Sequence, residues 1–519
     1  MADRLSLYST LRAYTEQLSQ TEDFSRLLEC ASSTPSLIQR VGAVQGIRPA
    51  VEANLAHEGS TPLVVLVSSG RQAAQTAEEI RSWYDGPSHD IAVLDAWETL
   101  PHERLSPRAD TVASRMAIFR RLAHPALEVS AQLGPIKILV TPVRSLIQPI
   151  VVGVQDVEPL IFCRGDSMDM HDVVERLIEN AYTRTDLVME RGQFAVRGGI
   201  LDLFPPTAPH PVRIDFFGDD IDEIHEFHAS DQRTYGDDLD SVWATACREI
   251  PLTAQVRQRA HDLIGHIANA DDMLESIAQG IPVEGMESLI PALCDDVMPV
   301  YKLFEKNTLV LVHDEERVRR AAEDLLTTAQ EFLAASWHVA ATGGQSEVPI
   351  SFEKSSFIEL QSVFDDIESM GSSIWMLTEF GVDEDVEGTV ALHAQHSEEY
   401  RGDESKATQG IAAFIEQQMR VVITCAAKGT LARLERILRE TGIDISEVSF
   451  VLSHVSSGFV DNQAGLAVLT EKDITGRSSV AAQMRTLSKR RKAIDLVDLK
   501  PGDFVVHDKH GIGRFVELQ

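Results

Sequence analysis

Continuous apolar runs that end at short polar turns recur along the first part of the chain. One such run covers residues 62–67, is followed by Ser68-Ser69-Gly70, and leads into a helical pattern over residues 71–83. Further strands are predicted at residues 91–94 and 136–140, the second followed by a helix-like stretch. Continuous rather than alternating apolar runs are typical of strands buried on both faces of a parallel sheet. Repeated strand–turn–helix units therefore predict an α/β domain.

The pattern changes near residue 155. Residues 172–182 have the apolar spacing of an amphipathic helix, and short strands separated by glycine turns follow at 193–197 and 200–204. Residues 212–227 are typical of a β-hairpin. We interpret residues 156–210 as a small α+β insertion.

The parallel pattern resumes after the insertion. A buried strand is predicted at 307–312, and another α/β unit near 350, with strands at 373–377 and 421–424. The acidic stretch 381–406 is interpreted as a loop. From Leu499 the pattern becomes β-rich, and the first hairpin of a barrel is predicted between Val505 and Phe515.

Composition restricts the function. The chain has 47 Lys and Arg against 80 Asp and Glu, a net charge of −33, which repels a phosphate backbone and disfavours broad non-specific nucleic-acid binding. The five cysteines are scattered singly, so neither a zinc ribbon nor a disulfide framework is supported. The start of the chain lacks a signal peptide, and no apolar run approaches the roughly 20 residues that span a bilayer. We expect a reduced, soluble, cytoplasmic protein without a membrane partner.

Nucleotide chemistry is disfavoured by the turn after residue 67. A phosphate-binding loop needs several glycines and a Lys-Ser/Thr pair, whereas this turn has Gly70 and Arg71. The pair Asp314-Glu315 follows a strand, where such folds bind Mg²⁺, but without the loop it has no phosphate to act on. The acidic run from Asp215 to Glu223 lacks the spacing of a calcium site. We expect no catalytic, cofactor-binding or metal-binding residue in this chain.

Three arginines of the insertion are unusual in so acidic a chain. Arg184, Arg191 and Arg197 lie close together in sequence, and arginine is a strong interface anchor. One interpretation is a protein-docking surface; the other is pairing within the chain with Asp186 and Glu190. The sequence alone leaves both open.

Several motifs carry a family resemblance. Residues 190–205 and 212–222 resemble a region shared by the excision-repair protein UvrB and the bacterial transcription-repair coupling factors. Residues 95–101 with Ser106-Pro107, residues 284–287 and residues 469–474 resemble the coupling factors specifically. Residues 502–515 resemble the start of their RNA-polymerase-interaction domain.

The resemblance implies transcription-coupled nucleotide-excision repair. The family's full protein displaces stalled RNA polymerase by ATP-driven translocation on double-stranded DNA and recruits UvrA. Its motor, with ATP and Mg²⁺, lies C-terminal to this chain, and the family's distal C-terminal region masks the UvrA-docking surface. The implied UvrA anchors are Arg184, Arg191 and Arg197, supported by Phe204. Contacts to the β subunit of RNA polymerase lie mostly beyond Gln519, with Arg514 and Phe515 in the barrel start.

Two alternatives compete with this hypothesis: a UvrB-like helicase that loads onto damage, and a repair scaffold without a motor. The missing phosphate loop argues against the first. The chain is also expected to lack the long DNA-clamping hairpin of UvrB, because residues 97–140 are too few for it.

The predicted fold class is a multidomain α/β protein. A helicase-like parallel domain with a degenerate phosphate loop is interrupted by the insertion, and a second α/β domain and the start of a β-barrel follow. The expected boundaries are a first half at 1–155, the UvrA-binding insertion at 156–210, a second half at 211–345, a spacer domain at 346–480, a basic helical linker at 481–496 and the barrel start at 497–519.

Overall fold

The computed structural model describes residues 11–31, 39–58, 62–101, 103–125, 134–267, 270–342, 356–383, 385–477, 504–507 and 511–514. The chain divides into two compact units, each described by itself. The large unit comprises residues 18–44 and 48–392, and the small unit comprises residues 1–17, 45–47 and 393–519.

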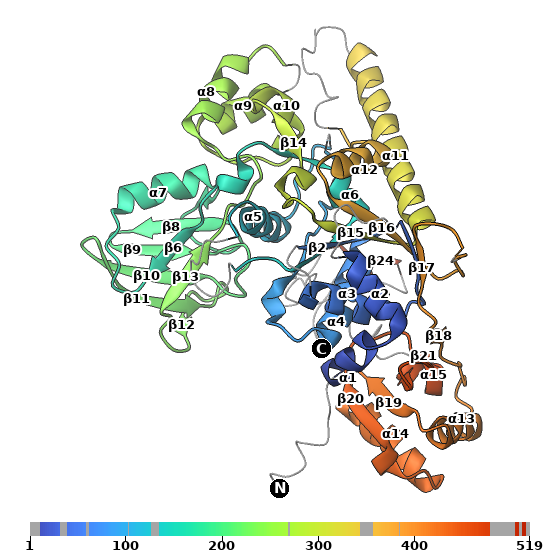
Figure 1. Cartoon of the computed structure of the whole chain (residues 1–519). Coiled ribbons are helices and arrows are strands. Elements are labelled where there is room, and N and C mark those ends of the chain that lie inside the picture. Colours follow the sequence, from blue (N-terminus) through green and yellow to red (C-terminus); the bar gives the residue numbers. More distant parts are fainter. Residues whose placement is uncertain are drawn as a thin grey trace. The chain divides into compact units, whose positions relative to one another are not determined.

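A seven-stranded sheet forms the centre of the large unit (Figure 1). Each pair of neighbouring strands is parallel, which confirms the predicted parallel α/β fold. The two central strands, β15 and β2, are buried along their whole length, as their continuous apolar runs predict. In spatial order the strands are β17 (Thr389–Ala391), β1 (Arg40–Gly42), β16 (Ser373–Thr378), β15 (Leu309–His313), β2 (Leu63–Val67), β4 (Ile138–Pro142) and β3 (Ile91–Val93).

Helices connect these strands and bury their apolar sides against the sheet and one another. Helix α4 shows how the sequence sets a boundary: it begins after Ser69, whose side chain accepts a hydrogen bond from the backbone of Gln72, and it ends at Trp83, which is fully buried. Helix α2 (Glu22–Ala31) precedes the first strand, and the helices after it are α3 (Arg48–Glu58), α4 (Gly70–Trp83), α5 (Ala109–Ala123), α6 (Val143–Ile147), α11 (Glu315–Thr342) and α12 (Leu360–Ser369).

The structure corrects the expected boundary of the spacer domain at residue 346. Strand β16 pairs with β15, with Leu311 opposite Trp375, and β17 pairs with β1. Both strands therefore extend the sheet of the large unit instead of opening a second domain. The apolar pattern predicts a buried strand at 373–377 correctly, but periodicity does not say which sheet a strand joins.

A six-stranded sheet forms a module of its own within the large unit. All its pairings are antiparallel except that of β7 with β8. Helix α7 (Met170–Glu179) covers one face of this sheet, with Val173 and Leu177 in the core (Figure 1). The strands follow the order β12 (Thr234–Tyr235), β11 (Asp220–Phe227), β10 (Val212–Phe217), β9 (Ile200–Leu203), β8 (Gln193–Arg197) and β7 (Thr183–Arg184).

The expected boundary at residue 210 falls inside this module. Strands β9 and β10 are hydrogen-bonded neighbours, with Leu203 opposite Val212. Strand β6 (Leu160–Cys163) pairs with β13 (Ser241–Ala244). The segments that lead into and out of the module are therefore neighbouring strands. Glycine turns and alternating residues continue past 210 because the second half of the same sheet begins there.

Shorter elements complete the large unit. Strand β5 (Pro149–Val151) pairs with β14 (Val297–Pro299), and helices α8 (Ala254–Leu263), α9 (Asp271–Ala278) and α10 (Ile290–Leu293) lie between the module and β14 in sequence. Core residues of these helices, such as Leu274 and Leu293, belong to the same apolar cluster as the module and the parallel sheet. One apolar cluster thus runs through the parallel sheet, the module and these helices.

The small unit is a second α/β fold with its own sheet. Strand β19 (Arg420–Cys425) lies between two parallel partners, β20 (Val448–Leu452) and β22 (Leu466–Thr470), and β21 (Phe459–Asp461) and β18 (Gln395–His396) extend the sheet beyond β22. The main helices are α13 (Glu404–Glu416), α14 (Lys428–Glu440) and α15 (Glu471–Thr475), and α1 (Arg12–Ser19) begins the described chain. The predicted loop at 381–406 in fact contains β17, β18 and the start of α13.

The predicted hairpin near the end of the chain is present. Strands β23 (Phe504–His507) and β24 (Gly511–Arg514) are antiparallel, with Val506 opposite Ile512. Phe515 and the basic residues between Arg485 and Lys492 lie outside the described residues.

Candidate functional site

The six-stranded sheet packs one face into the core beneath α7, and its other face carries charged as well as apolar side chains. Successive residues of a strand point to opposite faces, so Leu201 and Ile214 face the core beneath α7 while Asp202 and Arg213 face the other way. We call this second side the outer face. Its residues on the central strands are Ala195, Arg197, Ile200, Asp202, Arg213, Asp215, Phe217, Glu223 and His225.

One buried carboxylate binds two arginines on the outer face. Asp202 is 2% exposed, and its oxygens accept hydrogen bonds from Arg213 Nε at 2.7 Å and Arg213 Nη2 at 3.0 Å. Arg197 Nη2 donates to the same carboxylate at 3.2 Å, while half of the Arg197 side chain remains exposed. The hydrogen bonds to Asp202 raise the pKa of Arg213. Asp202 therefore holds both guanidinium groups in fixed positions.

The other two arginines have different surroundings. Arg191 donates from Nε and Nη2 to the carbonyl of Ala208 at 3.2 Å, and its guanidinium lies 5.3 Å from the ring centre of Phe204. Phe204 is buried in a small apolar cluster with Val188, Ala195 and Phe227. Arg184, on β7, is exposed and has no ion pair among the described residues.

The structure thus places all four sequence-predicted residues on one module. The alternative of pairing with Asp186 and Glu190 is wrong for Arg191 and Arg197, whose partners are Ala208 and Asp202. Sequence reasoning missed Arg213, although its signal was present: it alternates with the core residues Val212 and Ile214 on a predicted strand.

Carboxylates near the hairpin surround a histidine. His225 Nε2 lies 2.9 Å from Glu223, and His225 Nδ1 lies 3.3 Å from Asp238. The side chains of Asp215, Glu223 and His225 are close enough together to hold a metal ion. Burial raises the pKa of Asp215. Since a protein carboxylate already lies beside each ring nitrogen of the histidine, we assign no metal to this cluster.

The turn after β2 is closed by its own side chains. Gln72 Oε1 accepts hydrogen bonds from the backbone nitrogen of Ser68 at 3.3 Å and from its hydroxyl at 3.0 Å. A phosphate-binding loop instead leaves its backbone amides free for the ligand. In this chain the Ser68 amide has an internal partner.

The carboxylate at the end of the neighbouring strand also has a protein partner. Asp314 follows β15, and its Oδ1 accepts a hydrogen bond at 3.1 Å from Arg48, which is 2% exposed. Asp314 has a φ of 55°, a left-handed conformation that is uncommon for a residue other than glycine. The Asp314 carboxylate thus has a buried protein cation as a partner. Asp314 and the Ser68 turn lie at the carboxyl ends of adjacent strands.

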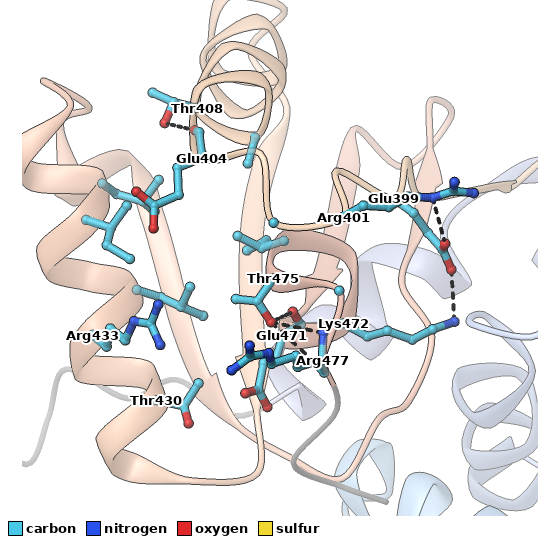
Figure 2. Close-up of a pocket in the computed structure, with 17 residues that line it drawn as sticks. Glu399, Arg401, Glu404, Thr408, Thr430, Arg433, Glu471, Lys472, Thr475 and Arg477 are labelled. Carbon is cyan, nitrogen blue, oxygen red and sulfur yellow. Dashed lines mark hydrogen bonds and ion pairs between the residues drawn. The ribbon is translucent and has the colours of Figure 1, made fainter.

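The small unit has a surface hollow of about 820 Å³ beside α13, α14 and α15 (Figure 2). Its lining combines apolar residues, such as Leu434 and Ile474, with charged side chains. Glu399 binds Lys472 Nζ at 2.9 Å, and this contact lowers the pKa of the Glu399 carboxyl. The lining contains no histidine, cysteine or serine. We assign no chemistry to it.

No helix in the described part of the chain is long and apolar enough to cross a membrane.

Comparisons with known proteins agree with the boundaries of the module. The model of the UvrB interaction domain matches residues 160–244, which run from the first residue of β6 to the last residue of β13. The model of the CarD-like/TRCF RID domain matches residues 499–519, which include the terminal hairpin. Transcription-repair-coupling factor from Mycobacterium tuberculosis (strain CDC 1551 / Oshkosh) is 39% identical to this chain, and the alignment covers 95% of the chain.

The chain is related to the N-terminal part of the transcription-repair-coupling factors. The factor of Myxococcus xanthus is 29% identical over 88% of the chain, and that of Escherichia coli (strain K12) is 23% identical over 90%. The chain spans only 40–42% of the length of these relatives.

Three segments that resemble the coupling factors lie in the large unit, at residues 95–101, 106–107 and 284–287, and the fourth, at residues 469–474, belongs to the small unit. Arg115 and Glu249 form an ion pair that is 0% and 1% exposed, and Glu249 also accepts a hydrogen bond at 2.7 Å from the Trp97 indole. Arg115 Nη1 donates to the carbonyl of Asp95 at 2.8 Å. The coupling-factor motif at residues 95–101 is therefore fixed in place by a buried charge pair.

A second contact joins two more of these motifs. Ser106 donates its hydroxyl to Glu287 at 2.5 Å and accepts a hydrogen bond from the backbone of Gly285 at 2.9 Å. A Cβ at Gly285 would lie 2.5 Å from the backbone of Arg104, so this approach requires glycine. The coupling-factor motifs at residues 106–107 and 284–287 thus interlock and have a structural role.

Proposed function

We propose that this chain docks UvrA through the outer face of its six-stranded sheet and so links transcription to nucleotide-excision repair. The observation that carries the proposal is the arrangement of Arg197 and Arg213 on the single buried carboxylate of Asp202, inside a segment that matches the UvrB interaction domain. Arg184 and Arg191 lie on the same module.

Fixed arginines make effective docking groups. An exposed arginine normally loses side-chain freedom when it binds, which reduces affinity. Asp202 removes part of this freedom beforehand for Arg197, because it holds one end of the guanidinium while half of the side chain stays accessible. Arg191 is likewise fixed by Ala208 and by the ring of Phe204. Phe204 therefore acts from within the module, as support for Arg191.

The second part of the proposal concerns RNA polymerase. Residues 499–519 match the start of the domain named for this interaction, and the hairpin β23–β24 is formed. We infer that Arg514 and Phe515 belong to the polymerase-contacting module and that the β subunit is its target. In the complete protein, ATP-driven movement on double-stranded DNA is the task of a motor beyond residue 519. Work with these partners takes place in the cytoplasm.

A binding experiment tests the UvrA assignment. Isothermal titration of the 519-residue chain with UvrA should give a measurable affinity, and the Arg184→Ala/Arg197→Ala double variant should lower it by at least about thirtyfold, since a central interface arginine contributes about 2 kcal/mol. Arg436→Ala is the matched control, because Arg436 is exposed and lies on α14 in the small unit. Wild-type affinity in the double variant would refute the assignment.

The UvrB-like helicase remains the rival function. It requires nucleotide binding at the Ser68 turn, where Gln72 holds the loop, and a free carboxylate at Asp314, which binds Arg48. ATP-dependent DNA unwinding by the purified chain would favour the rival.

A further inference from the structure

An exposed phenylalanine stands at the end of the outer face. Phe217 is the last residue of β10, and 82% of its surface is exposed. On β10, Arg213 is opposite Asp202 and Asp215 is opposite Ile200, so Phe217 is the next residue on the same face. Phe217 therefore continues the row that begins with Arg213.

The backbone around Phe217 is fixed by a neighbouring turn. The amide of Phe216 donates to the carbonyl of Gly199 at 2.8 Å, and a Cβ at Gly199 would lie 2.8 Å from the carbonyl oxygen of Phe216. This close approach brings the β8–β9 turn against the end of β10. As a result Ile200, which is 37% exposed, and Phe217 lie at the same end of the sheet.

Single exposed apolar residues are common and need no explanation. Phe217 differs because a second exposed apolar residue, Ile200, lies at the same end of the outer face, and carboxylates flank it: Asp215 precedes it by two residues on β10 and Asp220 is paired with it on β11. An aromatic side chain with an apolar neighbour and a charged rim is the usual composition of an interaction hot spot.

We propose that Phe217 is the apolar anchor of the docking face and inserts into an apolar pocket of UvrA whose rim carries basic groups. The basic groups are required by charge complementarity, because the carboxylates of Asp215 and Asp220 border the phenylalanine. This inference rests on the proposed function, and it assigns to the β10–β11 turn the part of the binding energy that the arginines do not supply.

The test compares two phenylalanines of equal exposure. Phe217→Ala should weaken UvrA binding by the 519-residue chain about tenfold to a hundredfold, as loss of a hot-spot side chain does. Phe380→Ala is the matched control, because Phe380 is 83% exposed but follows β16 beside Glu379, away from the six-stranded sheet in sequence and pairing. Both variants should keep the wild-type melting temperature, since neither side chain is packed.

The kinetics separate the anchor from the arginines. Removal of an apolar anchor should speed dissociation and leave the salt dependence of binding unchanged, whereas Arg197→Ala should also reduce that salt dependence. Surface plasmon resonance at several salt concentrations measures both effects.

The outcomes are distinct. If Phe217→Ala binds like wild type while the Arg184→Ala/Arg197→Ala double variant does not, the anchor is refuted and the docking function stands. If Phe217→Ala and Phe380→Ala lose affinity equally, the anchor is also refuted, because the effect is not specific to this face. If the unmodified chain does not bind UvrA, both proposals fail.

Discussion

Replacement of Arg115 by methionine should destabilise the large unit strongly. Methionine fills a similar volume but leaves the Glu249 carboxylate, 1% exposed, without its cation. Glu249 would retain the Trp97 indole as a donor, and the carbonyl of Asp95 would lose the guanidinium. A charge left alone in a dry interior is among the most destabilising changes that a single substitution makes.

The expected size follows from the burial of the pair. Breaking a buried ion pair by removing one partner costs about 3–5 kcal/mol. In domains of 150–250 residues, 1 kcal/mol corresponds to roughly 2–4 °C in melting temperature, and the large unit lies beyond the upper end of this range. At about 2 °C per kcal/mol the melting temperature of Arg115→Met should fall by about 6–10 °C.

Differential scanning calorimetry checks this value, and a double variant identifies its cause. Arg115→Met combined with Glu249→Gln removes both charges while an amide oxygen remains for Trp97. The double variant should therefore melt above Arg115→Met. A melting temperature for Arg115→Met within 2 °C of wild type, or a double variant less stable than either single variant, would show that the buried charges do not govern the stability of this region.

Four further outcomes are expected. Asp202→Asn should lower both the melting temperature and the affinity for UvrA, measured by calorimetry and titration, because one carboxylate positions Arg197 and Arg213. The chain should show no ATPase activity above background in a phosphate-release assay, and an activity abolished by Asp314→Asn would contradict this. Burial raises the pKa of Glu287 above its ordinary 4.5, so the native state binds this proton more tightly than the unfolded state; its stabilising contribution is complete below pH 4.5 and is lost as the pH rises through the folded pKa. The melting temperature of Glu287→Gln relative to wild type should therefore rise from pH 4.5 towards neutral. Finally, the chain should bind RNA polymerase weakly in a pull-down, and extension through a complete barrel should strengthen binding, since an isolated hairpin is marginal; equal binding would place the contact upstream.

The sequence predicted well which segments form strands and helices, but it predicted poorly which strands pair with one another. Continuous apolar runs correctly indicated β2 and β15, because strands buried on both faces cannot alternate. The same reasoning identified the strand at 373–377 but assigned it to a separate domain. Which sheet a strand joins depends on contacts between residues far apart in sequence. The local spacing of apolar residues does not report these contacts.

The residues proposed for docking show the same limit. Arg184, Arg191 and Arg197 were identifiable as an excess of positive charge in an acidic chain. The partners of these arginines were not identifiable from the sequence. Asp202 is five residues from Arg197 in sequence, and it lies opposite Arg213 only because β9 pairs with β10. Sequence proximity suggested Asp186 and Glu190, whereas strand pairing selected Asp202.

The contact of Arg48 with Asp314 couples the start of α3 to the end of β15. Arg48 also donates from Nε to the carbonyl of Ala43 at 3.1 Å, so one buried guanidinium bridges two segments of the large unit. Substituting Lys-Ser/Thr into the turn at Ser68 would leave this bridge in place, whereas removing Arg48 would leave a carboxylate in left-handed backbone without its partner. Redesign of this edge of the sheet therefore has to treat Arg48 and Asp314 as one unit, because replacing Asp314 alone would leave the buried guanidinium with the Ala43 carbonyl as its remaining acceptor in these two contacts.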